Sequence, residues 1–450
     1  MESLGICLAF STLLGYLHKA IEQIADPRKP SNNTNYSIKD AVLSAFSVFF
    51  MQCPSFLDNQ RQMQSRKGQD NAQTLFEVEA IPCDNQIRNI LDGIQTSYLT
   101  PIFTWVYQAL KSGGHLKAYQ VLGDNLLVPL DGTEYFSSEK IHCPCCSSRQ
   151  HKNGKVTYFH QALLPVIVAP GNPNVISLAP EFITPQDGHD KQDCEQQAAK
   201  RWIKAHTQQF KDVQITLLGD DLYSRQPSCE LCLEEKFNFI FVCLPESHSS
   251  LYEWLDFLDI NGELHRLQQR QWDGKQWLFY HYRYVNSIPL REQQPALLVN
   301  WFEVTVSREA DGKQLYHNAF ITRHGLTDSL MPEISQAARA RWKTENENHN
   351  VLKTKGYHLE HNFGHGQQHL ASFLLTLNLL AFLFHTVLLL VDQSYQLIRK
   401  RVVRRDTFFE HLRTLTRYLV FESWRELITF MLTESEPRPT RRTKPRIDSS

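Results

Sequence analysis

The stretch AARARWKTENENHNVLKTKGY, residues 337–357, carries the residues on which the interpretation of the whole chain depends. Ala, Arg, Lys and Glu dominate its first half and Gly356 stands near its end, which predicts a helix that stops there. On a 3.6-residue period, Lys343 and Glu347 fall on a solvated face. The opposite, inward face would carry Ala338, Arg341, Trp342, Glu345, His349 and Leu352. An inward carboxylate is costly unless it is paired or holds a metal, so Glu345 needs a partner.

Two strand-like runs upstream of this helix also end in acids. The apolar run NLLVPL, residues 125–130, is followed by Asp131, and the run VQITLL, residues 213–218, is followed by Gly219, Asp220 and Asp221. In open α/β sheets, functional side chains gather at the carboxyl ends of the strands. Each of these sequences is also a common turn, so neither one alone indicates a site.

Together, Asp131, Asp220 and Glu345 predict a metal site. Three carboxylates that converge from separate elements are not stable unpaired, and two divalent cations would satisfy them. Mg²⁺, or Mn²⁺ in its place, suits carboxylate ligands together with phosphate oxygens, as in two-metal phosphoryl transfer. The alternative for Glu345 is a plain ion pair with Arg341, one turn back along the helix.

The order of the predicted elements indicates an α/β fold with a mixed sheet flanked by helices. Residues 111–260 alternate strands and helices, whereas residues 261–316 are rich in Trp, Tyr, Phe and Val and contain two hairpin turns, at Asp273-Gly274 and Asp311-Gly312. This β-rich insertion precedes a last strand and the Glu345 helix in residues 317–357. Helical regions are expected at 1–110, which could read DNA or simply cap the next domain, and at 358–432, followed by a disordered basic tail at 433–450.

These motifs resemble those of the bacterial DDE insertion-sequence transposases of insertion sequence family four. Residues 130–133 (LDGT) resemble the first-Asp motif of that family, and residues 217–223 (LLGDDLY) resemble the second. In the second motif of the family, two residues separate the acid from an aromatic residue. Because Asp221 and Leu222 separate Asp220 from Tyr223, this spacing selects Asp220 over Asp221. Residues 341–345 (RWKTE) resemble the Arg-x3-Glu signature around the third acid.

The resemblance implies an RNase H-like catalytic domain interrupted by a β-rich region before the last acid. It also implies metal-dependent cleavage of DNA at the ends of a mobile element, followed by joining of the freed 3′-OH to target DNA. Asp131, Asp220 and Glu345 would be the catalytic metal ligands, and Arg341, with Lys353 or Lys355, would contact DNA phosphates. The expected partners are the terminal inverted repeats, target DNA and a second copy of the chain, in the bacterial cytoplasm.

Two positions depart from the family signature. The signature has Tyr where this chain has Ala338, and Lys where it has Leu352, with Lys353 one residue later. These departures favour the alternative of a DNA-binding relative that has lost catalysis.

A second group of residues has metal-ligand spacing. Cys143 and Cys146 form a Cys-x2-Cys pair, and with His151 and His160 they could hold a structural zinc ion. The alternative is a set of reduced thiols without metal. A histidine-rich stretch further on is expected to be a DNA-facing or capping loop, with a metal site as the alternative: His358, His361, His365 and His369.

Composition adds few constraints. A net charge of −1 over 450 residues names no partner, and ten cysteines are too few for a disulfide scaffold, which favours a reduced cytosolic setting. The N-terminal apolar run is expected to be a helix rather than a signal peptide, since its leading charge is Glu2. The uncharged residues 373–391 are long enough to span a membrane. Because Asn378 and His385 interrupt them, a buried core helix is expected, and a membrane anchor is the alternative.

Overall fold

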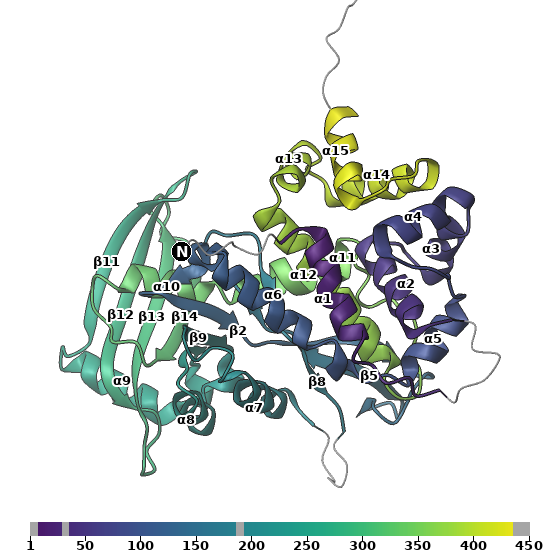
Figure 1. Cartoon of the computed structure of the whole chain (residues 1–450). Coiled ribbons are helices and arrows are strands. Elements are labelled where there is room, and N and C mark those ends of the chain that lie inside the picture. The colour runs from purple at the N-terminus through teal and green to yellow at the C-terminus, as the bar shows by residue number, and fades with distance from the viewer. Residues whose placement is uncertain (1–7, 29–35, 186–192, 435–450) are drawn as a thin grey trace, which may run out of the picture.

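The computed structural model describes residues 8–28, 36–185 and 193–434. Its centre is an eight-stranded mixed sheet with the strand order β1-β2-β9-β10-β14-β13-β12-β11 (Figure 1). The strands β2, β9 and β10 are parallel, and the remaining neighbours pair antiparallel. The bounds are β1 Gln120–Val121, β2 Asn125–Pro129, β9 Gln214–Gly219, β10 Asn238–Val242, β11 His265–Trp272, β12 Trp277–Pro289, β13 Leu298–Arg308 and β14 Gln314–Thr322. The predicted α/β class with a mixed sheet is confirmed.

The parallel strands are the apolar runs of the sequence. Every residue of β2 is buried, as are all but the first of β9 and β10. Strands that are covered on both faces read as continuous apolar runs rather than alternating ones, which is why these segments could be recognised. The helices α7 (Glu195–His206) and α8 (Gln226–Glu234) lie side by side below the central strands in Figure 1.

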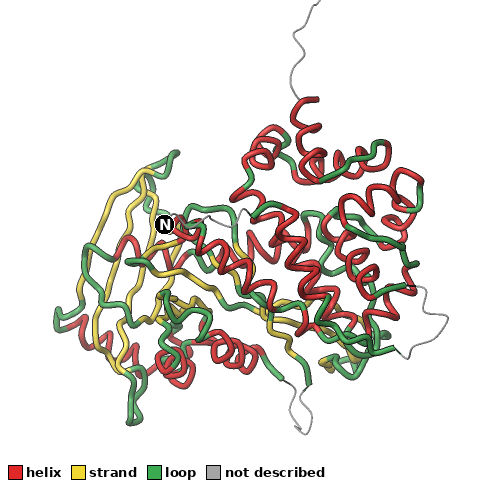
Figure 2. The backbone as a smooth tube through the Cα atoms, in the orientation of Figure 1, coloured by secondary structure: helices red, strands yellow, loops and turns green. Residues whose placement is uncertain are grey.

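The β-rich segment before Glu345 extends the central sheet. Its two predicted hairpin turns join β11 to β12 and β13 to β14, with Gly274 and Gly312 at positive φ. Tight hairpin turns need a residue at positive φ, which glycine adopts without steric cost. These long strands form the left end of the molecule in Figure 2, where they are yellow. Helix α9 (Ser249–Ile260) precedes them.

A smaller sheet lies beside the parallel strands. In it, β3 (Gly132–Ser138) pairs with one edge of β5 (Val156–Leu163). Strands β4 (Ser147–Gln150) and β8 (Glu181–Ile183) pair with successive parts of the other edge. The short strands β6 (Val166–Ile167) and β7 (Ile176–Ser177) form a separate pair. Because β3 begins directly after Asp131, this sheet leads the chain away from the first predicted acid.

The helices before and after the sheet pack on one another. They are α1 Phe10–Ile21, α2 Ile38–Phe50, α3 Phe56–Met63, α4 Arg66–Phe76, α5 Asp84–Asp92 and α6 Pro101–Ser112, then α12 Leu370–Val391, α13 Gln393–Arg401, α14 Arg405–Tyr418 and α15 Trp424–Glu434. Helix α12 contacts α2 and α5, and α14 contacts α4, where the Asn71 amide donates to Thr416 O at 2.6 Å. The two helical regions are distant in sequence but lie side by side (Figure 1).

Side chains cap some of the helices, and others begin without such a cap. Ser37 caps α2 by accepting a hydrogen bond from Asp40 N at 2.9 Å. Asp84 is the first residue of α5, and Cys83 occupies the cap position without a side-chain hydrogen bond. An acid in the first turn still interacts favourably with the helix dipole.

Helix α12 is, within the described ranges, the one helix long and apolar enough to cross a membrane. Of its most apolar window, 83% is buried inside the protein. Its polar residues are paired there: Asn378 Nδ2 donates to Tyr357 O at 2.8 Å, and His385 bridges Phe50 O and the Tyr395 hydroxyl, each at 2.8 Å. Burial lowers the pKa of His385 to about 3, so the ring is neutral. The packing is that of a core helix, as predicted.

The predicted helix through Glu345 is interrupted. Helix α10 spans Met331–Arg339, a π-helical turn spans Thr344–His349, and α11 spans Asn350–Thr354. A π turn inserts one extra residue and shifts the helical register. The predicted inward face is therefore wrong at Trp342, which is 45% exposed, and at Glu345, whose side chain is 40% exposed. Thr344, Asn348 and His349 are buried.

Candidate active site

Asp131 and Asp220 leave the same edge of the central sheet. Strands β2 and β9 are parallel, with Pro129 opposite Leu218, and Leu130 N continues the ladder by donating to Leu218 O at 2.8 Å. Asp131 and Asp220 each lie two residues beyond this last paired position. The two acids of the sequence motifs are thus neighbours because the strands are parallel and in register.

The charges around Asp131 show that four acids share this site. Burial and the charges of Glu195, Glu345 and Asp220 together raise the pKa of Asp131 to about 7, against the opposite effect of Arg341. We call Asp131, Glu195, Asp220 and Glu345 the acidic site. In the described part of the chain, Asp131, Asp220 and Glu345 do not place one carboxylate oxygen each within 4.8 Å of one another.

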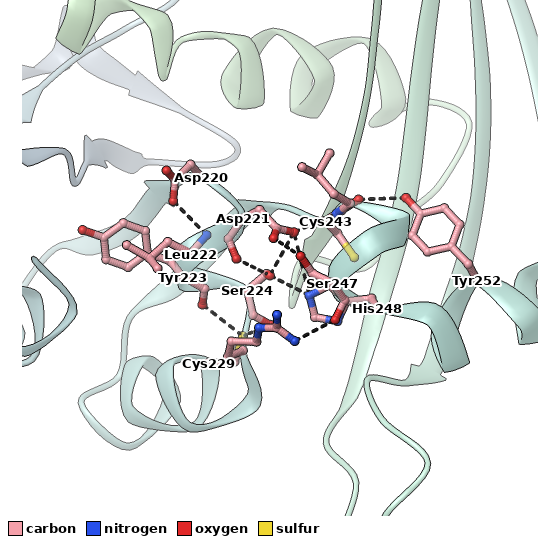
Figure 3. A network of polar contacts seen from close by, with 12 residues as sticks. Asp220, Asp221, Leu222, Tyr223, Ser224, Cys229, Cys243, Ser247, His248 and Tyr252 are labelled. Carbon is pink, nitrogen blue, oxygen red and sulfur yellow. Dashed lines mark hydrogen bonds and ion pairs between the residues drawn. The ribbon is translucent and has the colours of Figure 1, made fainter. Parts of the chain in front are cut away.

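The two acids after β9 have different surroundings. Asp221 accepts hydrogen bonds from Leu244 N at 2.8 Å and from the Ser247 hydroxyl, and its side chain is held in a network with Ser224 and His248 (Figure 3). Asp220 points away from that network and accepts from Leu222 N at 2.9 Å, which caps the short helix η3 (Asp221–Tyr223). Asp221 is therefore fully engaged in the fold, and Asp220 keeps oxygen lone pairs for a ligand.

This difference predicts opposite consequences for two alanine variants. Asp221→Ala removes the acceptor for Leu244 N and Ser247, and we expect it to lower the free energy of unfolding by about 2 kcal/mol. Asp220→Ala removes one cap on a short helix and should cost at most about 1 kcal/mol. Urea denaturation of both variants measures the difference. Equal losses would contradict the assignment of Asp221 to the fold.

Glu345 forms an ion pair within its own helix. Arg341 Nη1 lies 3.3 Å from Glu345 Oε1, and the Arg341 side chain is largely buried, stacked near the Trp342 ring. The simple pairing weighed from the sequence is therefore present. It does not remove Glu345 from the acidic site, because the charge of Glu345 still acts on Asp131.

Glu195 is a fourth acid that sequence reasoning missed. It begins α7, and its Oε1 accepts a hydrogen bond from the Tyr223 hydroxyl at 2.7 Å. A Cβ at position 132 would lie 2.5 Å from Glu195 Oε2, so Gly132 is needed beside Asp131 for this approach. Burial raises the pKa of Glu195, and the nearby charge of Asp220 acts in the same direction. No spacing marks this residue in the sequence, where it is one acid in the first turn of a predicted helix.

His349 contacts Asp131 from the π-helical turn. Its Nδ1 lies 3.4 Å from Asp131 Oδ2. Burial, together with the nearby charge of Lys353, lowers the pKa of His349 to about 4. The ring is neutral at pH 7, so this contact does not neutralise Asp131, and Arg341 is the cation that acts on it.

The two departures from the family signature lie at buried positions. Ala338 and Leu352 are both enclosed in the core, where a Lys side chain at position 352 would have no solvent for its charge. Lys353, one residue later, is half-buried and pairs with Glu360 at 2.8 Å. Lys355 follows α11 and is exposed. The basic side chain that the family signature has at position 352 is therefore found one residue later, at Lys353, which is not enclosed in the core.

The raised pKa of Asp131 predicts a pH-dependent stability. The folded protein keeps the Asp131 proton up to about pH 7, whereas the unfolded chain releases it near the ordinary value of 3.8. Folding is therefore penalised as pH rises from about 4 to 7, and the full penalty applies above 7. Because Asp131 is 23% exposed, we expect about 2 kcal/mol rather than the full value. Asp131→Asn should recover this amount in metal-free protein at about pH 8 and little at about pH 4, as measured by urea denaturation.

The predicted zinc ligands are partly rearranged. Cys143, Cys146 and His160 lie together, but the fourth ligand atom comes from His365. The expectation for His151 is wrong, since its ring is exposed and lies 2.8 Å from the Thr157 hydroxyl. Residue His365 belongs to the histidine-rich stretch expected to face DNA or cap a helix. We call Cys143, Cys146, His160 and His365 the Cys/His cluster. Burial, with a contribution from His365, lowers the pKa of His160 to about 4.

Comparison with solved structures gives a weak likeness. No protein-family model matches the chain, and no curated protein matches it. A cryo-EM structure of the piggyBac transposase synaptic complex with hairpin DNA is similar, with a TM-score of 0.40 and 10% sequence identity. The likeness covers 96% of this chain and 80% of that chain. At these values it does not assign an activity.

Proposed function

We propose that this chain is a DDE-type DNA transposase whose catalytic acids are Asp131, Asp220 and Glu345. One observation carries the proposal: two acids leave the same edge of a parallel sheet in register, and the third acts on the first of them electrostatically. The motifs around the three residues, which resemble those of insertion sequence family four, supply the reaction class. The bacterial origin and cytoplasmic location belong to the same proposal.

The donor set fits a hard divalent cation. The carboxylates of Glu195, Asp220 and Glu345 act on Asp131, and Arg341 is the cation that acts on it, so the site carries excess negative charge. Oxygen ligands of this kind are those that Mg²⁺ and Mn²⁺ prefer. Asp131, Asp220 and Glu345 would hold two such ions. When bound, the ions would activate the attacking oxygen and stabilise charge on the leaving oxygen of a phosphodiester.

The chain's own residues would position the DNA strand. Arg341 lies beside Glu345 and would exchange part of that ion pair for a phosphate oxygen, to which a guanidinium binds with two parallel hydrogen bonds. Lys353 and Lys355 would contact phosphates further along the strand. Tyr223 and Glu195 would fix the turn that carries Asp220, since their hydrogen bond links α7 to that turn. Terminal repeats and target DNA are the proposed partners, with a homodimer joining two ends.

A DNA-binding relative without catalysis is the second candidate. Ala338 and Leu352 favour it, because both replace residues of the family signature. The Arg341–Glu345 ion pair is compatible with it as well. This candidate predicts binding to the same DNA ends without cleavage.

An end-cleavage assay distinguishes the active transposase from the inactive DNA-binding relative. The full chain is incubated with labelled DNA that carries the inverted repeats flanking its own reading frame, in Mg²⁺, Mn²⁺ or EDTA. A transposase produces nicks with a free 3′-OH at the repeat ends in either metal and none in EDTA. Binding without nicks in both metals would support the inactive relative, and the absence of specific binding would contradict both candidates.

A further inference from the structure

The Cys/His cluster has the dimensions of a tetrahedral metal site. The Sγ atoms of Cys143 and Cys146 are 3.8 Å apart, and His160 Nε2 lies 3.5 Å from each of them. His365 Nε2 lies 3.6 Å from Cys146 Sγ. A zinc ion with ordinary bond lengths at the centre of a tetrahedron requires S···S edges of about 3.8 Å and S···N edges of about 3.6 Å. Four of the six edges match these lengths, and the two others, from His365 to Cys143 and to His160, are within 4.8 Å.

The surroundings of the cluster suit a closed site. All four residues are buried, and the rings of Tyr135 and Phe136 cover the two imidazoles, with Phe136 4.3 Å from the His365 ring. Cys143 N lies 3.4 Å from Cys146 Sγ, toward which it donates. Amide groups that point at a cysteine sulfur stabilise its thiolate form, which is the form that binds metal. A closed set of four protein ligands is typical of structural rather than catalytic zinc.

The loop that carries His365 is held in place independently of the cluster. Asp92, the last residue of α5, accepts hydrogen bonds from the backbone N–H groups of Gln367, Gln368, His369 and Leu370 at 2.9 to 3.1 Å. Gly366, at positive φ, has no room for a side chain beside Asp92. These contacts place His365 at the fourth corner of the tetrahedron.

A metal-free explanation accounts poorly for this arrangement. A disulfide requires an S–S distance of about 2.05 Å, and the two sulfurs lie 3.8 Å apart. Without a metal, two thiols and two imidazoles would be buried against one another. Each group would then lose its hydrogen bonds to water and form only weak hydrogen bonds to sulfur. Two sulfur and two nitrogen donors in a tetrahedron select zinc among the common divalent ions.

We propose that Cys143, Cys146, His160 and His365 bind one structural zinc ion. The ion fastens the small sheet of β3, β4 and β5, which begins directly after Asp131, to the loop between α11 and α12, which follows the segment bearing Glu345. It thereby ties together the chain segments that carry the first and third acids. The site is independent of any bound DNA, and its existence does not rest on the proposed transposase activity.

Zinc content of matched variants tests the site. The full chain, produced without a histidine tag in zinc-supplemented medium, is analysed by inductively coupled plasma mass spectrometry. We expect one equivalent of zinc in the native chain and in the controls His151→Ala and Cys145→Ser. His365→Ala and Cys146→Ser should lose most of it. Zinc that is lost equally from His151→Ala and His365→Ala, or a native chain without zinc, would overturn the proposal.

Cobalt substitution provides a readout that needs no variant to fold. Native chain depleted of zinc by a chelator is titrated with Co²⁺, and the visible spectrum is recorded. Tetrahedral coordination by two thiolates produces intense d–d bands and a sulfur-to-metal charge-transfer band, which zinc then displaces. Weak bands of an octahedral ion would contradict the site. Chelation should also lower the thermal midpoint, because the ligands lie on separate segments of the fold.

Discussion

Replacing Asp131 by Asn is expected to reduce DNA end cleavage by about three orders of magnitude, since the loss of a metal ligand removes several kcal/mol of transition-state stabilisation. Asn keeps the shape of Asp131 but not its charge, so the site loses a largely buried carboxylate. Single-turnover cleavage of a labelled repeat end in Mg²⁺ measures the effect. DNA binding should be unchanged, because the phosphate contacts are assigned to other residues.

Glu347→Gln is the matched control for this variant. Glu347 lies on the same π-helical turn as Glu345, but it pairs with Lys343 and does not act on the pKa of Asp131. We expect native cleavage from Glu347→Gln and a loss comparable to Asp131→Asn from Glu345→Gln. Cleavage by Asp131→Asn at the native rate would remove the proposed mechanism. Combined with the stability gain expected at about pH 8, the variant should be more stable and inactive, which a merely misfolded protein could not be.

Truncating Phe384 to Ala is expected to lower the free energy of unfolding by about 3–5 kcal/mol. The Phe384 ring lies in the middle of α12, fully buried, with its centroid 5.4 Å from that of Phe46 on α2. The neighbouring helices cannot collapse onto the cavity without disturbing the contacts between the N-terminal and C-terminal helical regions. The midpoint of urea denaturation, measured without detergent, records the loss.

Phe257→Ala is the control, because it makes the same Phe-to-Ala change at an exposed position. Phe257 lies on α9 and is 64% exposed, so its truncation should change the free energy of unfolding by no more than about 0.5 kcal/mol. If Phe384→Ala cost no more than Phe257→Ala, α12 would not be a core helix in solution. The membrane anchor would then again be the better interpretation of residues 373–391.

Much of the fold could be predicted because its signals are local. The runs before Asp131 and Asp220 are apolar over the length of a buried strand, and the hairpins at Gly274 and Gly312 need residues that tolerate positive φ. Helix α12 could be assigned to the core because its polar residues, among them Asn378, are too many for a simple membrane span and find partners inside. Period, composition and turn chemistry act within a few residues, so they can be read from one chain.

The register around Glu345 could not be predicted in this way. A 3.6-residue period assumes i→i+4 hydrogen bonds throughout, and the π-helical turn at Thr344–His349 breaks that assumption. Packing against the sheet selects the turn, since it buries Asn348 and His349 and places His349 beside Asp131. Trp342, which precedes this turn, is 45% exposed, although the 3.6-residue period predicted it on the inward face.

By itself, then, the sequence determined the mixed α/β class, the strand ends that carry Asp131 and Asp220, and the presence of a Cys-x2-Cys pair with metal-ligand spacing. Only the tertiary structure decided that Glu195 joins the acids and that His365, rather than His151, completes the Cys/His cluster. The physical reason is distance along the chain. Cys146 and His365 are 219 residues apart, and no periodicity or motif encodes a contact that exists only after the sheet and the two helical regions have packed together.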